Sequence, residues 1–251
     1  MFAWISKLFV SLLAFTSEGS QFVFGRLAVG PEVTGSFGFF FAFQVLPTII
    51  FFASLMAVLY HLGIMQRVVQ GMAWVMLRLL RTSGAESLCV AANTFIGQTE
   101  APLVIRPYLA TLTESELFTI MTSGMAHIAG GVMAGYIQML GQSFAEAHHI
   151  PLAEAQLKFA VQLLAASTMA APASLAISKI LYPEVGEPVT RGTVKLDIPK
   201  NASNVIEAAA TGAGDGLQLS LNVAGMLLAF IALIALFNYL FLAVGDVLHV
   251  N

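Results

Sequence analysis

Apolar residues in this chain gather in long runs, and polar residues fall mainly between those runs. A helix that crosses a bilayer needs roughly 20 consecutive, predominantly apolar residues. Four runs reach that length: residues 37–62, 117–140, 157–181 and 217–244. The pattern therefore predicts an all-α membrane protein with about four transmembrane helices.

Three further apolar stretches fit a membrane-spanning helix poorly. Residues 2–15 are short and amphipathic, and residues 64–80 carry two arginines at helical spacing, so both predict helices that lie in the membrane interface. Residues 86–109 are long enough to cross the bilayer. They contain, however, a set of side chains that a lipid-facing helix would not tolerate: Glu86, Asn93, Gln98, Glu100 and Arg106.

Composition supports a membrane setting and argues against several functions. The chain of 251 residues is 58% hydrophobic and 10% charged, whereas soluble domains have about 25% charged residues. A net charge of −3 gives no reason to expect a nucleic-acid partner. The single cysteine, Cys89, excludes an intrachain disulfide, and the absence of HExxH and GxSxG motifs argues against an enzyme.

Positive charge predicts the orientation of the chain in the membrane. Lysines and arginines concentrate in residues 67–106 and 179–200, whereas residues 141–156 contain neither. By the positive-inside rule both basic segments face the cytoplasm, and the first span runs inward. Residues 83–110 then enter and leave the membrane on the same side, which predicts a re-entrant hairpin. Residues 183–205, polar and rich in turn formers, are expected to be a flexible cytoplasmic linker.

The tip of the predicted hairpin is the polar sequence "NTFIGQTEAP", residues 93–102. Backbone groups at a re-entrant turn lack helical partners and are tolerated only where they line a cavity or meet other protein. Carbonyl groups there suit a sodium ion, and Gln98, Thr99 and Glu100 offer donors and acceptors to a polar solute. The alternative is that these side chains pack in a protein-filled interior and are satisfied by neighbouring helices.

Smaller features concern the surroundings of the hairpin. Four glycines lie at spacings that bring a helix face close to a neighbour, which we expect to be the hairpin: Gly124, Gly130, Gly131 and Gly135. Thr113 precedes an acidic first turn and predicts a helix N-cap. Arg106 is expected to anchor the hairpin by pairing with Glu86 or Glu116.

Several of these segments together resemble the concentrative nucleoside transporter family. The resemblance rests on "GQTEAPLVIRPYLATLTESEL" followed by "MTSGMAHIAGGVMAGYI", and on "QFVFG", "FAFQVLPTIIFFASLMAVLYHLGIMQ", "AAPASLAISKILYPE" and "NVIEAAATGAGDGLQL". These motifs cover essentially the whole chain, in order. The resemblance implies nucleoside import driven by sodium or, in some members, by protons. It also implies a homotrimer in the cell inner membrane, with no cofactor besides the coupling ion.

In that family a scaffold holds a mobile transport domain built from two inverted repeats, each with one re-entrant hairpin. The resemblance implies an external interfacial helix and loop in residues 1–35 and a scaffold helix in 36–63. One transport-domain repeat would fill 64–182, with its hairpin at 83–110, before the linker at 183–205 and a scaffold helix at 206–251.

The resemblance also implies two sets of site residues. Gln98, Thr99 and Glu100 would bind the nucleobase from the hairpin, and Val132 on the following helix would line the same pocket. Sodium would be held by backbone carbonyls and one amide side chain, from Asn93, Ile96, His127 and Ile128.

Two departures from the family pattern affect these expectations. His127 stands where the family has Ser or Thr. Either sodium coupling is weakened or replaced by a proton, or the site uses the residue-127 carbonyl and the ring points away. The chain also ends at Asn251, before the second hairpin of the family. The alternative function is therefore a non-transporting half that needs a second polypeptide.

Overall fold

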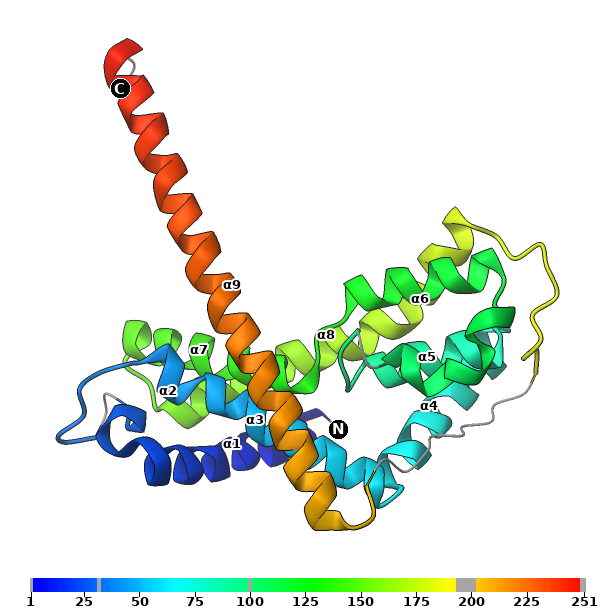
Figure 1. Cartoon of the computed structure of the whole chain (residues 1–251), viewed down its shortest axis with the longest axis horizontal. Helices are drawn as coiled ribbons and strands as arrows, with labels where there is room; N and C mark the ends of the chain where they lie inside the picture. The colour runs from blue at the N-terminus through cyan, green and yellow to red at the C-terminus, as the bar shows by residue number, and fades with distance from the viewer. Residues whose placement is uncertain (1, 31–32, 99–100, 193–201, 249–251) are drawn as a thin grey trace.

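The computed structural model describes residues 2–30, 33–98, 101–192 and 202–248, and these residues are helical apart from turns, loops and one antiparallel bridge between Ser83 and Arg191 (Figure 1). The elements in chain order are α1 (Phe2–Phe24), η1 (Gly25–Ala28), α2 (Phe41–Gln44), α3 (Leu46–His61), α4 (Ile64–Leu80), α5 (Gly84–Asn93), η2 (Ala101–Thr111), α6 (Glu114–Ala126), α7 (Gly130–His148), α8 (Leu152–Leu181) and α9 (Val205–Leu248).

The predicted transmembrane helices are confirmed by length and composition. Four helical stretches of the described chain are long and apolar enough to cross a membrane: Phe41–His61, Glu114–His148, Leu152–Leu181 and Val205–Leu242. The stretch predicted as a re-entrant hairpin folds as α5 followed by the 3₁₀ element η2, and the two pack against each other.

The N-terminal helix is longer than predicted. It extends to Phe24 rather than ending near residue 15. The residues after Phe15 are polar, which suggested a loop, but Thr16 and Ser20 continue the buried helical face that Leu13 begins. α1 packs against α8, so protein covers this polar face and the helix continues where a loop was expected.

The second predicted span is two helices rather than one. α6 ends at Ala126, and His127 (φ −116°, ψ 158°) and Ala129 (φ −60°, ψ 146°) have extended backbone before α7 begins at Gly130. Within the apolar run, the only indication of this break is the glycine pair that follows it, because glycine disfavours a continuous helix.

The glycines of this span contact two different neighbours. A Cβ atom at Gly124 would lie 3.4 Å from Gln98 Cβ, and one at Gly130 would lie 3.0 Å from the Phe95 carbonyl oxygen, so these two meet the hairpin as expected. Gly131 and Gly135 instead approach Ile49 and Val45, around the start of α3. The expectation that the hairpin covers all four was therefore wrong for half of them.

The longest helix, α9, crosses α3 and then projects away from the other helices (Figure 1). Its buried face consists of small residues four apart, Ala208, Gly212, Gly216 and Ser220. A Cβ atom at Gly212 would lie 2.5 Å from Ala57 Cβ, so glycine is required for this close approach. Large apolar side chains on the rest of the helix up to Leu242 are exposed, as expected for a surface in contact with lipid or further protein.

The connecting segment after α8 is not a simple flexible linker. The Thr190 carbonyl accepts a hydrogen bond from the Gly84 N–H, and Thr190 Oγ1 accepts one from the Ala85 N–H, both at 3.0 Å. Thr113 Oγ1 donates to Glu184 Oε2 at 2.7 Å. Residues 183–192 are therefore attached to the starts of α5 and α6; residues 193–201 lie outside the described residues.

Candidate functional site

The first arm of the predicted hairpin, α5, begins with a capping box. Ser83 Oγ accepts the Glu86 N–H, and Glu86 Oε1 accepts the Ser83 N–H at 2.7 Å, so two donors at the helix start are satisfied. All ten residues of α5 are buried. The helix ends at Asn93, from which residues 94–98 turn towards η2. The carbonyl end of a fully enclosed helix therefore lies at the predicted hairpin tip.

The broken helix meets this tip. At the break, the last carbonyls of α6 and the first N–H groups of α7 lack partners within their own helices. The Gly130 N–H donates to the Phe95 carbonyl at 2.9 Å, which joins the start of α7 to the hairpin. Two helix C-termini and one N-terminus thus come together, and this brings partial negative and partial positive charge to one place.

Side chains at this junction form a short polar chain. Asn93 Nδ2 donates to Ser123 Oγ at 3.3 Å, and His127 Nδ1 lies 3.3 Å from the same hydroxyl and 2.9 Å from the Ser123 carbonyl. Because a carbonyl can only accept, Nδ1 of His127 must carry the proton in this arrangement. Asn93 Oδ1 is buried and has no hydrogen-bond partner among the described residues. Amide oxygens are among the ligands that hard cations take in proteins.

The predicted ion ligands lie in or beside this junction. Asn93 and His127 are both buried and are connected through Ser123, which the sequence did not single out. Ile96 donates its N–H to the Ala92 carbonyl at 3.0 Å and is partly buried in the tip. Ile128 lies in the break and packs against the apolar cluster around Met133.

The predicted nucleobase residues are placed only in part. Gln98 is exposed at the hairpin tip beside Gly124 of α6, and Val132 is partly buried in the first turn of α7. Thr99 and Glu100 lie outside the described residues. Of the four predicted residues, Gln98 and Val132 are therefore the two that the structure describes, and both belong to elements that meet at the junction.

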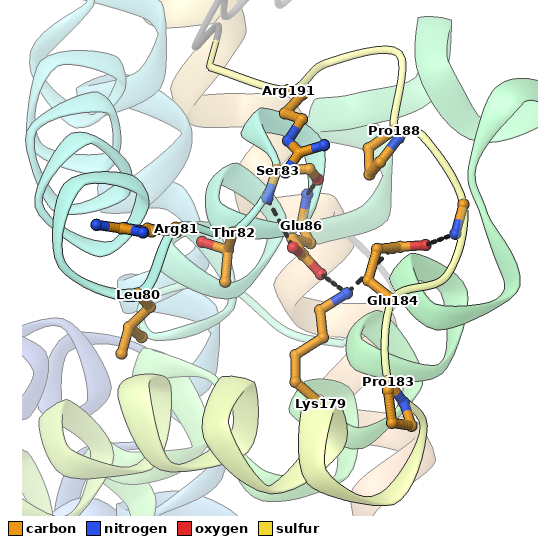
Figure 2. A pocket seen from close by; sticks show the side chains of 11 residues that line it. Leu80, Arg81, Thr82, Ser83, Glu86, Lys179, Pro183, Glu184, Pro188 and Arg191 are labelled. Atoms are coloured by element: carbon orange, nitrogen blue, oxygen red, sulfur yellow. Dashed lines mark hydrogen bonds and ion pairs between the residues drawn. The ribbon is translucent and has the colours of Figure 1, made fainter.

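A second polar cluster lies at the opposite end of α5, beside a cavity of about 280 Å³ (Figure 2). Lys179 Nζ of α8 lies 2.8 Å from Glu86 Oε2 and 3.3 Å from Glu184 Oε2. The predicted pairing of Glu86 with Arg106 is therefore wrong. Arg106 is exposed on η2, whereas Lys179 reaches Glu86 from a helix distant in sequence. Lys179 could not be identified from the sequence as the partner of Glu86, because α5 and α8 become neighbours only in the folded chain.

The two carboxyl groups at Lys179 have opposite pKa shifts. Burial raises the pKa of Glu86, and the Lys179 ammonium and the Ser83 N–H offset only part of that effect. Burial also acts against ionisation of Glu184. There, however, hydrogen bonds from Thr113 and the Gly186 N–H, together with the Lys179 charge, hold the pKa below its usual range.

Comparisons with known proteins identify the relatives of this chain. A family model described as "Nucleoside recognition" matches residues 42–143, and one described as "Na+ dependent nucleoside transporter C-terminus" matches residues 162–251. Mouse sodium/nucleoside cotransporter 2 is 41% identical over 251 residues, and the uncharacterized transporter YutK of Bacillus subtilis is 48% identical over 240 residues. The chain belongs to the concentrative nucleoside transporter family.

A solved member of this family has the same fold. The structure of CNTnw in an inward-facing, substrate-bound state superposes with a TM-score of 0.82 and is 43% identical, covering 99% of this chain and 55% of CNTnw. The chain spans about half of YutK (54%) and about a third of the mouse cotransporter (34%). The relatives named for an activity are transporters, which confirms the expectation that the family is not enzymatic.

Proposed function

We propose that this chain takes part in nucleoside import coupled to a cation gradient, as a multi-pass protein of the cell inner membrane. The observation that carries the proposal is the junction of the hairpin tip with the broken helix, where the amide oxygen of Asn93 is buried and has no hydrogen-bond partner among the described residues. Two relatives are named sodium/nucleoside cotransporters, which supports the proposal. Transport would proceed by alternating access, with the hairpin and its partner helices moving as one unit through the membrane.

Sodium is the coupling ion that the junction fits best. The C-terminal ends of α5 and α6 bring carbonyl oxygens and partial negative charge to one place, which favours a cation. Asn93 would bind it through its backbone carbonyl and amide oxygen, and Ile96, His127 and Ile128 would bind it through their carbonyls. The bond from His127 Nδ1 to the Ser123 carbonyl excludes that nitrogen as a ligand, and a neutral imidazole nitrogen at Nε2 is a poor ligand for sodium, so we assign the His127 carbonyl to the ion.

The nucleoside would bind beside the ion. Gln98, Thr99 and Glu100 would offer hydrogen bonds to the base from the hairpin, and Val132 would provide an apolar wall. The position of Gln98 next to α6 supports this arrangement, because α6 leads directly to the break. CNTnw has been seen in an inward-facing state and a doubly substituted variant of it in an outward-facing state, which supports movement of such a site across the membrane.

The test is uptake of labelled uridine into proteoliposomes that contain the 251-residue chain. An inward sodium gradient is expected to drive uptake, and Glu100→Gln is expected to abolish it, with Glu187→Gln as an exposed control. Uptake driven equally well by choline and by sodium would overturn sodium coupling. If a proton gradient then drives uptake and His127→Thr restores sodium dependence, a proton is the coupling ion in the native chain.

A second arm tests whether the chain acts alone. Because it aligns with about half of YutK, the alternative is a half-transporter that requires a second polypeptide. Uptake that appears only after co-reconstitution with a polypeptide covering the remaining length of the relatives would establish that alternative.

We further propose a homotrimer, with part of the exposed apolar surface of α9 covered by neighbouring subunits. Light scattering of the purified protein measures the number of subunits.

A further inference from the structure

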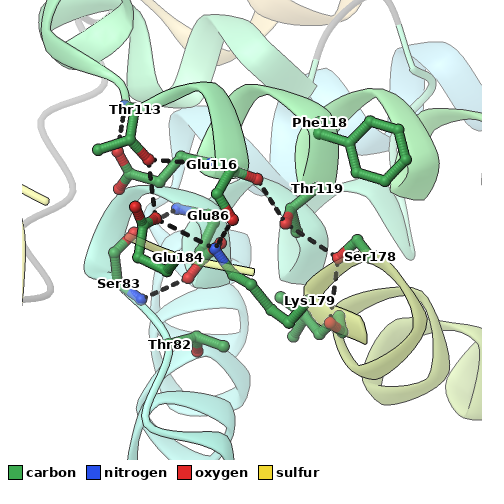
Figure 3. A network of polar contacts seen from close by, with 12 residues as sticks. Thr82, Ser83, Glu86, Thr113, Glu116, Phe118, Thr119, Ser178, Lys179 and Glu184 are labelled. Atoms are coloured by element: carbon green, nitrogen blue, oxygen red, sulfur yellow. Dashed lines mark hydrogen bonds and ion pairs between the residues drawn. The ribbon is translucent and has the colours of Figure 1, made fainter. Parts of the chain in front are cut away.

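The base of α5 is joined to three other elements through one lysine (Figure 3). Besides Glu86 of α5, Lys179 Nζ contacts Glu184 of the connecting segment and donates to Ser115 Oγ of α6 at 2.9 Å. Nζ donates hydrogen bonds to Ser115 Oγ and Glu184 Oε2 and forms an ion pair with Glu86 Oε2, so it contacts three different elements. Lys179 therefore fixes α5, α6 and the connecting segment to the end of α8.

This cluster is largely withdrawn from solvent. Glu86 is 1% exposed, Ser115 is 2% exposed, and the Lys179 side chain is 21% exposed. Removal of one partner from a buried ion pair leaves the other charge unpaired in a medium that solvates it poorly. Exposed ion pairs, by contrast, contribute little to stability. The contact of Lys179 with Glu86 is thus expected to matter far more than a surface pair.

The geometry of α5 connects this cluster to the proposed cation site. Glu86 and Asn93 lie seven residues apart on one continuous helix, which corresponds to about 10 Å along its axis. The base is held by Lys179 and Thr190, and the tip is held by the contact of Asn93 with Ser123. A helix held at both ends cannot tilt or slide without breaking contacts at one of them. The position of the Asn93 amide oxygen therefore depends on the contacts at the base.

We propose that Lys179 is a positioning residue for the cation site: it fixes the base of α5 so that Asn93, at the other end of the helix, is held in place to bind the ion. This role rests on the proposed function. Whether Lys179 holds α5 in place can be measured without transport. The positioning role and the proposed function can therefore fail separately.

Cys89 provides a direct measure of the position of α5. It is the only cysteine of the chain, lies one turn after Glu86 and is 2% exposed. Because the thiol is buried, labelling by a maleimide requires α5 to open. In the purified chain, Lys179→Met is expected to speed labelling about tenfold, because the helix opens more often. Lys179→Arg should stay near the native rate.

Lys158→Met is the matched control, because Lys158 lies on the same helix but is exposed and distant from the base of α5. Ser115→Ala removes one of the three partners of Lys179, together with the bond from Ser115 Oγ to the Tyr182 carbonyl, and should give a smaller increase. It keeps the proposal testable if Lys179→Met does not fold. Equal labelling rates for the native chain, Lys179→Met and Ser115→Ala would overturn the proposal.

Uptake measurements then test the effect on the ion. Lys179→Met is expected to raise the sodium concentration for half-maximal uptake about tenfold, while the nucleoside KM at saturating sodium changes less than about twofold. Lys179→Arg should restore the native value. A loss of maximal rate alone, with unchanged sodium dependence, would mean that Lys179 supports folding only and would contradict the positioning role. Absence of uptake in the native protein, both alone and after co-reconstitution with the remaining length, would contradict the proposed function instead and would leave the labelling result intact.

Discussion

Glu184 is a single residue that joins the connecting segment to two helices. Its Oε2 accepts from Thr113 Oγ1 at 2.7 Å and lies 3.3 Å from Lys179 Nζ, and its Oε1 accepts the Gly186 N–H at 3.0 Å. Glu184→Gln keeps the shape but removes the charge. We expect a loss of about 1 kcal/mol in the free energy of unfolding at pH 7, seen as a lower midpoint of thermal unfolding in detergent.

The effect of this substitution should depend on pH. Because the pKa of Glu184 in the folded protein lies below its usual value of 4.5, the ionised group stabilises the fold above that pH. This contribution is lost as the pH falls through the lower, folded-state pKa. The midpoints of native and variant protein should therefore converge under acid conditions. Glu187→Gln, in the same segment but exposed, should change little at any pH, and a difference for Glu184→Gln that persists in acid would contradict this account.

Among single residues, contacts between neighbours in sequence could be predicted, and contacts between residues far apart in sequence could not. The N-cap at Thr113 is confirmed as a capping box with Glu116, because its sequence spacing determines the contact. The pairing of Glu86 depends on which helices become neighbours. Arg106 was the nearer cation in sequence, whereas Lys179 is the nearer one in the fold. Ser123 was missed for a similar reason, since its contact with Asn93 crosses from α6 to the hairpin.

Among the elements, the pair α3 and α9 makes a sharp prediction about helix packing. A side chain at Gly212 would meet Ala57 Cβ at 2.5 Å and the Ala53 carbonyl at 2.8 Å, whereas Gly214 has nothing within 4 Å. Gly212→Leu should therefore force the helices apart, at a cost of about 1–3 kcal/mol. Gly214→Leu should be neutral or slightly stabilising, since leucine favours the helix.

Thermal unfolding of both variants in detergent measures this difference, and equal midpoints would show that α9 does not depend on close contact with α3.

The positions of the four spans were predictable because lipid demands long apolar runs. The break between α6 and α7 was not, because an apolar run has the same composition whether or not it is continuous. The broken backbone is stabilised by the hairpin, through the bond from Gly130 to Phe95.

At the scale of the whole molecule, the contacts of the connecting segment determine which parts can move together. The transport repeat was predicted to end at residue 182, but residues 183–192 contact the starts of α5 and α6 through Glu184 and Thr190. We therefore expect the moving unit to extend at least to Arg191, with any hinge towards α9 lying after it. The composition of this segment suggested a flexible linker because its polar residues were assumed to face water.

A reversible crosslink tests where this unit ends. Ser83 and Arg191 form an antiparallel bridge, and residues paired in this way have Cα atoms about 4.5–5.5 Å apart, within the range of a disulfide. In a Cys89→Ala background, Ser83→Cys with Arg191→Cys should crosslink on oxidation. Because we expect the two positions to move together, the oxidised protein should take up uridine as fast as the reduced protein.

The opposite outcome has an equally clear physical meaning. If oxidation stops uptake and reduction restores it, the connecting segment must leave the base of α5 during transport, and the bonds from Thr190 to Gly84 and Ala85 are broken in each cycle. The boundary of the moving unit would then lie near residue 182, as the sequence predicted. The reduced protein serves as its own control, since both states contain the same side chains and differ only in the bond between two sulfur atoms.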